Sequence, residues 1–168
     1  MKQIILLFEG HDYSGKTQIA RELSRLIDIP YFKNIRENEA FNRDELKYFT
    51  KYGGIYLADF LRQTGYSAII DRSYPSEYVY STVLDRDSCE NIFEIDKIFA
   101  LMGTQIIYCF KEDLTGYKDN LIDIELIPKI KIVYDKFFKL TKCRYYKLNT
   151  DNVDLNWQIK KILGYLNG

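Results

Sequence analysis

Short apolar runs alternate along the chain with longer stretches in which apolar residues recur every three or four positions. The runs are largely unbroken, which is typical of strands buried on both faces of a parallel sheet. They predict strands over Gln3–Phe8, Ser67–Asp71, Gln105–Phe110 and Cys143–Leu148, with Tyr31–Lys33 as a shorter candidate.

The stretches between the strands have helical periodicity or are polar. Helices are predicted over Thr17–Ile29, Arg43–Gln63, Ser76–Leu84, Glu90–Leu101, Glu125–Leu140 and Asn152–Leu166. The segments Asn34–Asn42 and Lys111–Asp123 are polar without a period and are expected to be loops. Strands that alternate with helices form crossover units, so we expect a three-layer α/β fold with a five-stranded parallel sheet between two helical layers.

Length and composition narrow the class of protein. The 168 residues fit a single domain over 1–168. Lys plus Arg equals Asp plus Glu at 24 each, which argues against a dedicated nucleic-acid or membrane-surface protein. No apolar stretch approaches the roughly 20 residues that span a bilayer. The cysteines, Cys89, Cys109 and Cys143, have no metal-like spacing, so we expect reduced thiols in a cytoplasmic protein.

The segment between the first strand and the first helix carries the sharpest chemical signal. It reads Gly10-His11-Asp12-Tyr13-Ser14-Gly15-Lys16-Thr17, which fits the phosphate-loop pattern G-x-x-x-x-G-K-[ST]. Glycines let such a loop curl so that backbone N–H groups converge on phosphate oxygens, and the following helix points its positive end at the same anion. Lys16 would reach the β- and γ-phosphates, and the Thr17 hydroxyl would hold Mg²⁺. The sequence therefore predicts a nucleoside-triphosphate site.

A second group, Asp71-Arg72-Ser73, follows the third predicted strand. Ligands of open parallel sheets lie beyond the carboxyl ends of the strands, so Asp71 is expected at the same edge as the phosphate loop. There a carboxylate could hold Mg²⁺ or accept a proton, and Arg72 could bind a phosphate with two hydrogen bonds. The alternative is structural: Asp71 caps the next helix and Arg72 pairs with it.

At this point the chain resembles a family. FEGHDYSGKT followed by DRSYPSEYVYS is similar to the thymidylate kinases and their small relatives, whose pattern is F-E-G-x-D-x-x-G-K-[ST] and then D-R-Y-x-x-S-x-x-A-Y-Q. Ser73, Val79 and Ser81 depart from that pattern. The resemblance implies the strand order 2-3-1-4-5, ATP and Mg²⁺ as cofactors, and a lid over about 111–123.

The resemblance also implies roles for individual residues. For phosphoryl transfer it implies catalytic roles for Lys16, Asp12, Asp71 and Arg72. It also implies that Thr17 and Asp71 bind the metal ion. On the acceptor side it implies contacts from Arg36, Arg72, Ser76, Glu77 and Tyr80, and a place for the acceptor base near Phe41, Phe49, Tyr52 and Tyr56. For Glu77, pairing with an arginine or stabilising the first turn of the helix are the alternatives.

One departure bears on catalysis. The family places an arginine in the phosphate loop or in the lid, whereas this chain has Tyr13 in the loop and no arginine in Lys111–Asp123. A supplied arginine is worth about 10³–10⁵ in rate in related chemistry. Arg86 is the best remaining candidate for this role, and a solvated cation at a helix end is its alternative.

These observations predict transfer of a phosphoryl group from ATP to a nucleoside monophosphate, with a deoxypyrimidine nucleotide such as dTMP as the leading acceptor. A kinase acting on a nucleoside or on a hydroxyl of nucleic acid, such as a modified base in DNA, is the second interpretation. A nucleotide-binding switch with slow hydrolysis is the third. No membrane partner is expected, nucleic acid is the less favoured partner, and a homodimer stays open.

Overall fold

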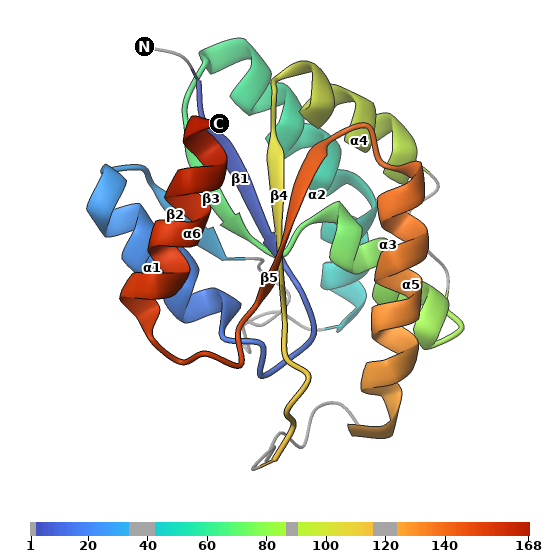
Figure 1. The fold of residues 1–168 in the computed structure, drawn as a ribbon. Helices are drawn as coiled ribbons and strands as arrows, with labels where there is room; N and C mark the ends of the chain where they lie inside the picture. The colour runs from blue at the N-terminus through green and yellow to red at the C-terminus, as the bar shows by residue number, and fades with distance from the viewer. Residues whose placement is uncertain (1–2, 34–42, 87–90, 116–123) are drawn as a thin grey trace.

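The computed structural model describes residues 3–33, 43–86, 91–115 and 124–168, and for residues 43–53 it describes the backbone alone. Five parallel strands form one sheet: β1 (Ile5–Glu9), β2 (Tyr31–Lys33), β3 (Ala68–Asp71), β4 (Gln105–Phe110) and β5 (Arg144–Asn149). Their order in the sheet is β2-β3-β1-β4-β5, which confirms the predicted order (Figure 1).

Helices cover both faces of this sheet (Figure 1). The helices are α1 (Lys16–Ile27), α2 (Arg43–Thr64), α3 (Tyr74–Val83), α4 (Ile92–Leu101), α5 (Ile127–Leu140) and α6 (Leu155–Asn167), with a short 3-10 helix, η2 (Ile124–Leu126), before α5. Helices α1 and α6 lie on one face, and α2 to α5 lie on the other. The three predicted layers are therefore confirmed.

Two apolar clusters hold the layers together, one on each face of the sheet. The cluster under α1 and α6 contains Leu6, Phe8 and Leu23, all fully buried. The larger cluster on the other face contains Phe99 and Phe137, which are also fully buried. Because alternate residues of one strand point to opposite faces, the continuous apolar run of β1 supplies both clusters.

Most predicted elements agree with the structure to within two or three residues at each end. Helix α3 begins at Tyr74, two residues before the prediction, because Pro75 lies in its first turn, where proline is well tolerated. Helix α5 begins at Ile127 after a 3-10 turn. The loop 34–42, Cys89 and the lid segment 116–123 lie outside the described residues.

The carboxyl ends of β1, β3 and β4 meet at one edge of the sheet, since Phe8 pairs with Asp71 and Glu9 pairs with Tyr108. The phosphate-loop segment and the Asp71 group therefore share this edge, as predicted. None of the described helices is long and apolar enough to cross a membrane.

Candidate active site

The loop Gly10–Gly15 leaves β1 and turns directly into α1. Gly10 has a φ of 144°, and a Cβ at this position would collide with the carbonyl oxygen of Cys109 on β4, so the loop depends on a glycine here. Tyr13 and Gly15 also have positive φ angles, of 67° and 74°. Within the described part of the chain, no side chain caps α1 at Gly15. The first N–H groups of α1 are therefore available to an anion.

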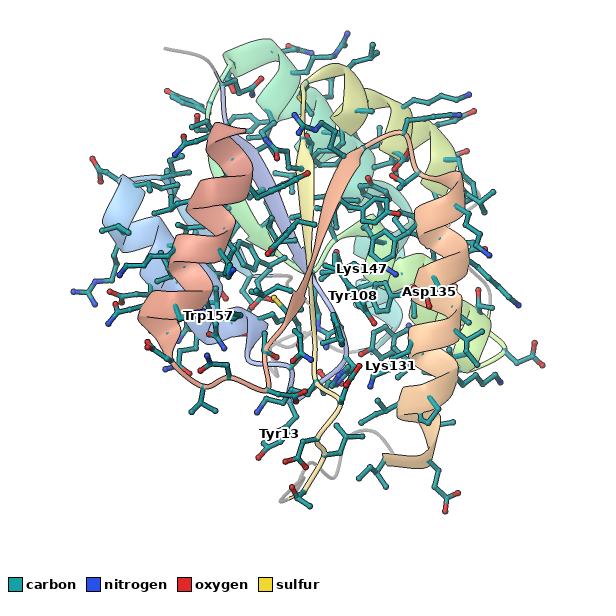
Figure 2. The ribbon with its side chains drawn as sticks, viewed as in Figure 1. Tyr13, Tyr108, Lys131, Asp135, Lys147 and Trp157 are labelled. Carbon is teal, nitrogen blue, oxygen red and sulfur yellow. The ribbon has the colours of Figure 1, made fainter. Side chains whose placement is uncertain are left out.

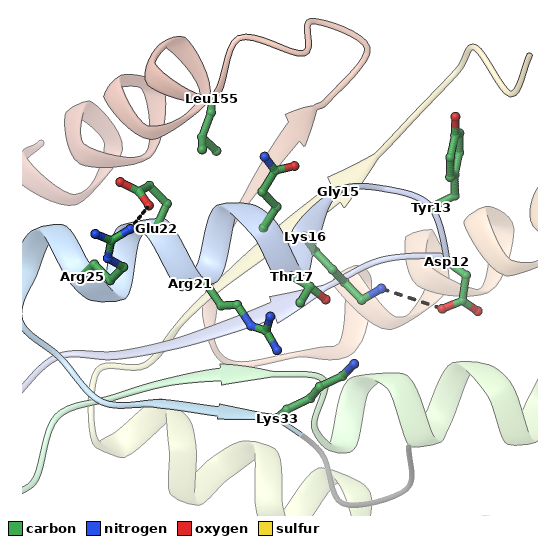
Figure 3. A pocket seen from close by; sticks show the side chains of 11 residues that line it. Asp12, Tyr13, Gly15, Lys16, Thr17, Arg21, Glu22, Arg25, Lys33 and Leu155 are labelled. Atoms are coloured by element: carbon green, nitrogen blue, oxygen red, sulfur yellow. Dashed lines mark hydrogen bonds and ion pairs between the residues drawn. The ribbon is translucent and has the colours of Figure 1, made fainter. Parts of the chain in front are cut away.

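Lys16, the first residue of α1, turns back over this loop (Figure 3). Its Nζ donates a hydrogen bond to the carbonyl oxygen of His11 at 3.3 Å and lies 3.9 Å from a carboxylate oxygen of Asp12. Burial lowers the pKa of Lys16 below its usual range. Among the described residues this buried ammonium contacts one carbonyl and one carboxylate, which leaves it suited to receive phosphate oxygens.

Asp71, at the end of β3, is 1% exposed. Its Oδ2 accepts hydrogen bonds from the Thr17 hydroxyl at 2.6 Å and from the Tyr31 hydroxyl at 2.9 Å. Its Oδ1 is buried and has no partner among the described residues. An unpartnered carboxylate oxygen beside a threonine hydroxyl fits Mg²⁺, which proteins usually hold through one or two such groups plus substrate phosphates.

The structural alternative for Asp71 and Arg72 is wrong. The N-cap of α3 is Ser73, and the Asp71 carboxylate is directed to Thr17 and Tyr31 instead. Arg72 pairs with Asp12 of the phosphate loop and not with its sequence neighbour as the alternative required.

Arg72 is itself 8% exposed and has a positive φ of 67°. Its guanidinium forms a short ion pair with Asp12, donates to the Ser76 hydroxyl at 3.3 Å, and lies 5.0 Å from the centre of the Tyr80 ring. The Tyr80 hydroxyl also reaches Asp12, at 3.5 Å. Three of the predicted acceptor-side residues, Arg72, Ser76 and Tyr80, are thus brought together beside the loop.

Behind Arg72 lies a buried polar group, centred on the motif residue Glu9, to which the sequence analysis assigned no role. Glu9 is 0% exposed and accepts hydrogen bonds from the backbone N–H of Ser73 at 2.7 Å, from the Ser76 hydroxyl, and from the Tyr134 hydroxyl at 3.1 Å. The Tyr134 hydroxyl in turn accepts the N–H of Gly10 at 3.2 Å. Burial raises the pKa of Glu9 to about 7.

His11 also has a defined position. Its ring is fully buried, and Nε2 accepts the backbone N–H of Lys111 at 3.1 Å. Because Nε2 is an acceptor, the ring proton belongs on Nδ1, which lies 2.6 Å from the carbonyl oxygen of Asp12. Burial lowers the pKa of His11, which favours this neutral form. The side chain links the loop to the residue that follows β4.

The remaining predicted residues lie further along α3 or outside the described part of the chain. Glu77 is 8% exposed and forms an ion pair at 3.9 Å with Arg86, which follows α3. Glu77 therefore pairs with an arginine, one of its predicted alternatives. Arg36 lies outside the described residues. Of the aromatic candidates for the acceptor base, Phe41 is outside them, the side chains of Phe49 and Tyr52 are not described, and Tyr56 is 71% exposed.

A cavity of about 710 Å³ opens beside the phosphate loop and extends along α1 (Figure 3). Lys16, Thr17 and Asp12 line its inner part, and Arg21, Arg25 and Lys33 add further cations. Arg21 stacks on Tyr31, with its guanidinium carbon 5.4 Å from the ring centre. The sequence analysis missed these three cations, because a basic residue on a helix face has no signature that distinguishes a cavity wall from a solvated surface.

Comparison with known proteins bears on the fold. No family model matches the sequence, and no curated protein matches it. Among solved structures, the YorR protein of Bacillus subtilis, in complex with phosphorylated GDP, is 20% identical with a TM-score of 0.69, over 97% of this chain and 95% of its own. The thymidylate kinase of Ehrlichia chaffeensis is 15% identical with a TM-score of 0.68, over 99% and 100%. The deoxyadenosine kinase of M. mycoides, with the products dCMP and dCDP bound, is 17% identical with a TM-score of 0.59, over 97% and 98%.

These likenesses define the fold as that of the P-loop kinases. The structural neighbours include two thymidylate kinases and a deoxyadenosine kinase, all at low sequence identity. The strand order and the resemblance of the two sequence motifs agree with this placement.

Proposed function

We propose that the protein transfers the γ-phosphoryl group of ATP to a nucleoside monophosphate, with a deoxypyrimidine nucleotide such as dTMP as the acceptor. The observation that carries the proposal is the placement of Arg72, a nearly buried guanidinium tied to the phosphate loop through Asp12. A nucleotide switch needs no second phosphate-binding arginine opposite its loop. A kinase whose acceptor carries a phosphate does, because that phosphate must lie close to the donor.

On the donor side, the loop N–H groups and Lys16 would hold the β- and γ-phosphates. Thr17 and Asp71 would hold Mg²⁺, which neutralises charge on the β- and γ-oxygens when bound. The cavity along α1 has room for the rest of the nucleotide. His11, Ser14 and Gly15 would act through their backbone, whereas the Asp12 carboxylate keeps Arg72 in position.

On the acceptor side, Arg72 would bind the acceptor phosphate through its planar pair of donors. Ser76 and Tyr80 orient Arg72, and we assign Arg36 to the same phosphate from the loop after β2. The names of the structural neighbours, a thymidylate kinase and a deoxyadenosine kinase, support a nucleotide or nucleoside acceptor. We extend the proposal to a cytoplasmic enzyme and keep the lid, which begins at Lys111, as a prediction.

An Arg72→Lys variant tests the acceptor assignment. Lysine keeps the charge but loses the two-pronged geometry, so kcat/KM for the monophosphate should fall by about 10- to 100-fold, while ATP affinity stays within about threefold. Arg62→Lys is the matched control, because Arg62 on α2 also pairs with an aspartate, Asp59, at 2.7 Å but on an exposed surface. It should leave both parameters unchanged.

The assay is run with nucleosides, nucleoside monophosphates and short DNA as acceptors. If Arg72→Lys lowered the ATP affinity and the kcat/KM for the acceptor equally, Arg72 would be a donor-side or structural residue. A free nucleoside or a DNA hydroxyl phosphorylated faster than any monophosphate would replace the proposed function with the second interpretation. Slow hydrolysis without transfer to any acceptor would favour the switch.

A further inference from the structure

Lys111, the first residue after β4, holds its side chain against the phosphate loop. Its Nζ lies 4.7 Å from the centre of the Tyr13 ring, and Tyr13 is a loop residue with a side chain that is 44% exposed. Figure 2 shows Tyr13 and Lys131 near the point where the chain leaves β4. A lysine outside the sequence motif is therefore brought to the loop by the fold.

The backbone of Lys111 is fixed on both sides. Its N–H donates to His11 Nε2 at 3.1 Å, and its carbonyl oxygen accepts from Lys131 Nζ of α5 at 2.5 Å. The ammonium is held differently. In the described part of the chain it forms no hydrogen bond or close ion pair, and it lies on the Tyr13 ring, while local hydrogen bonds and, to a lesser degree, the charge of this ammonium lower the pKa of the exposed Asp113 carboxyl. A cation on the face of an exposed ring is held weakly, and a phosphate oxygen is a stronger partner.

Phosphoryl transfer needs such a cation, because negative charge spreads over three oxygens of the group in flight. The other basic groups of the site already have partners. Arg72 pairs with Asp12, and Arg86, the candidate from sequence, pairs with Glu77 on α3. Lys111 is a described cation whose backbone is fixed at the loop and whose ammonium lies on an aromatic face, with the exposed carboxylate of Asp113 near enough to interact with its charge.

We propose that Lys111 is a catalytic residue that binds the γ-phosphoryl group of the donor during transfer, with Tyr13 as the positioning residue. The inference rests on the proposed function. In the step itself, the bond between the γ-phosphorus and the β,γ-bridging oxygen breaks, and a bond from an acceptor oxygen to the same phosphorus forms. Lys111 keeps its protons and supplies charge alone.

Three variants test the role of the positive charge of Lys111. Lys111→Met removes the ammonium but keeps the length of the chain, and Lys111→Arg keeps the charge. Lys161→Met is the matched control, because Lys161 Nζ lies 5.3 Å from the centre of the Trp157 ring on α6. We expect Lys111→Met to lower the single-turnover transfer rate by about 100-fold or more, and Lys111→Arg by less than about tenfold. Calorimetry should find ADP affinity unchanged within about twofold in all three, because ADP has no γ-phosphate.

Two variants test the role of the aromatic ring of Tyr13. Tyr13→Phe keeps the aromatic face and should keep kcat within about threefold, whereas Tyr13→Leu removes it and should lower kcat by about tenfold with little change in the KM for ATP. Rescue by phenylalanine is the signature of positioning through the ring. Equal losses in both variants would overturn the role of Tyr13.

The outcomes separate this inference from the proposed function. A wild-type chain that transfers phosphate, with Lys111→Met as fast as Lys161→Met, overturns the role of Lys111 and leaves the function standing. A parallel loss of rate and ADP affinity in Lys111→Met also overturns it, because that pattern marks a structural role. A wild-type chain that binds ADP but transfers nothing contradicts the proposed function and this inference together.

Discussion

The buried carboxyl of Glu9 makes the stability of the protein depend on pH in a direction opposite to that of most carboxylates. Burial raises the pKa of Glu9 from 4.5 to about 7, so the folded protein binds this proton more tightly than the unfolded chain does. This rise in the pKa corresponds to about 3 kcal/mol of folding free energy, at about 1.4 kcal/mol per pKa unit. That contribution to folding is complete below pH 4.5 and is lost as the pH rises through about 7.

The substitution Glu9→Gln isolates the effect. Glutamine has nearly the same shape and does not titrate. Its carbonyl oxygen can accept the hydrogen bond from Ser73 N–H, and its amide NH2 then faces the hydroxyls of Ser76 and Tyr134, which can accept. We expect the unfolding free energy of wild type, relative to the variant, to fall by about 2–3 kcal/mol between pH 4.5 and pH 7.5. Urea unfolding at a series of pH values, followed by circular dichroism, measures this difference directly.

The comparison needs a control, because other carboxylates also titrate in this range. Glu94→Gln removes an exposed carboxylate from the first turn of α4 and should keep the pH dependence of wild type. If Glu9→Gln had the same pH dependence as wild type, Glu9 would not titrate between these pH values. The nearby guanidinium of Arg72 would then hold it ionised in the folded protein, and the argument from burial would be refuted.

Three further substitutions test the loop and the proposed metal site. Lys16→Ala should abolish transfer, while the urea midpoint stays at or above that of wild type, because a buried charge is removed; retained transfer would contradict the site. Asp71→Asn should lower turnover by about 10²–10⁴-fold and weaken the Mg²⁺ dependence of the rate; a loss of stability with full turnover would contradict its role. Gly10→Ala should cost about 1–3 kcal/mol by urea unfolding, and a stability equal to wild type would show that the contact with Cys109 relaxes freely.

The strands could be predicted from sequence because a local run of apolar residues marks most of them. Gln105–Phe110 agrees with the structure residue for residue, since a strand covered on both faces leaves no polar alternation to misread. The edge strand Tyr31–Lys33 also agrees, although Phe32 and Lys33 are exposed. Helix starts were harder to predict. Tyr74 enters α3 because the fold buries its ring against Phe99 and Phe137, a contact between distant segments that local periodicity does not contain.

The meeting of Lys16, Thr17 and Asp71 at one edge of the sheet was predictable, because a motif fixes each residue and its spacing. It was not predictable where distant elements meet. Tyr134 lies on an amphipathic helix and looks like an ordinary core aromatic, yet its hydroxyl reaches the loop 124 residues away in sequence. The pairing of Arg72 with Asp12 likewise depends on two strand ends that only the sheet brings together.

Helix α5 contacts the phosphate-loop region at two points that are three residues apart. Lys131 binds the carbonyl oxygen of Lys111, and Tyr134 binds the N–H of Gly10, so both side chains lie on one side of the helix. Inserting or deleting one residue between Tyr134 and the core residue Phe137 would turn both away by about 100° at once. The outer face of α5 has no such constraint, since Ile132 is 57% exposed. This helix can therefore diverge freely in sequence on its outer face, but a segment grafted from another protein of this fold must keep the same rotational phase to leave the loop in place.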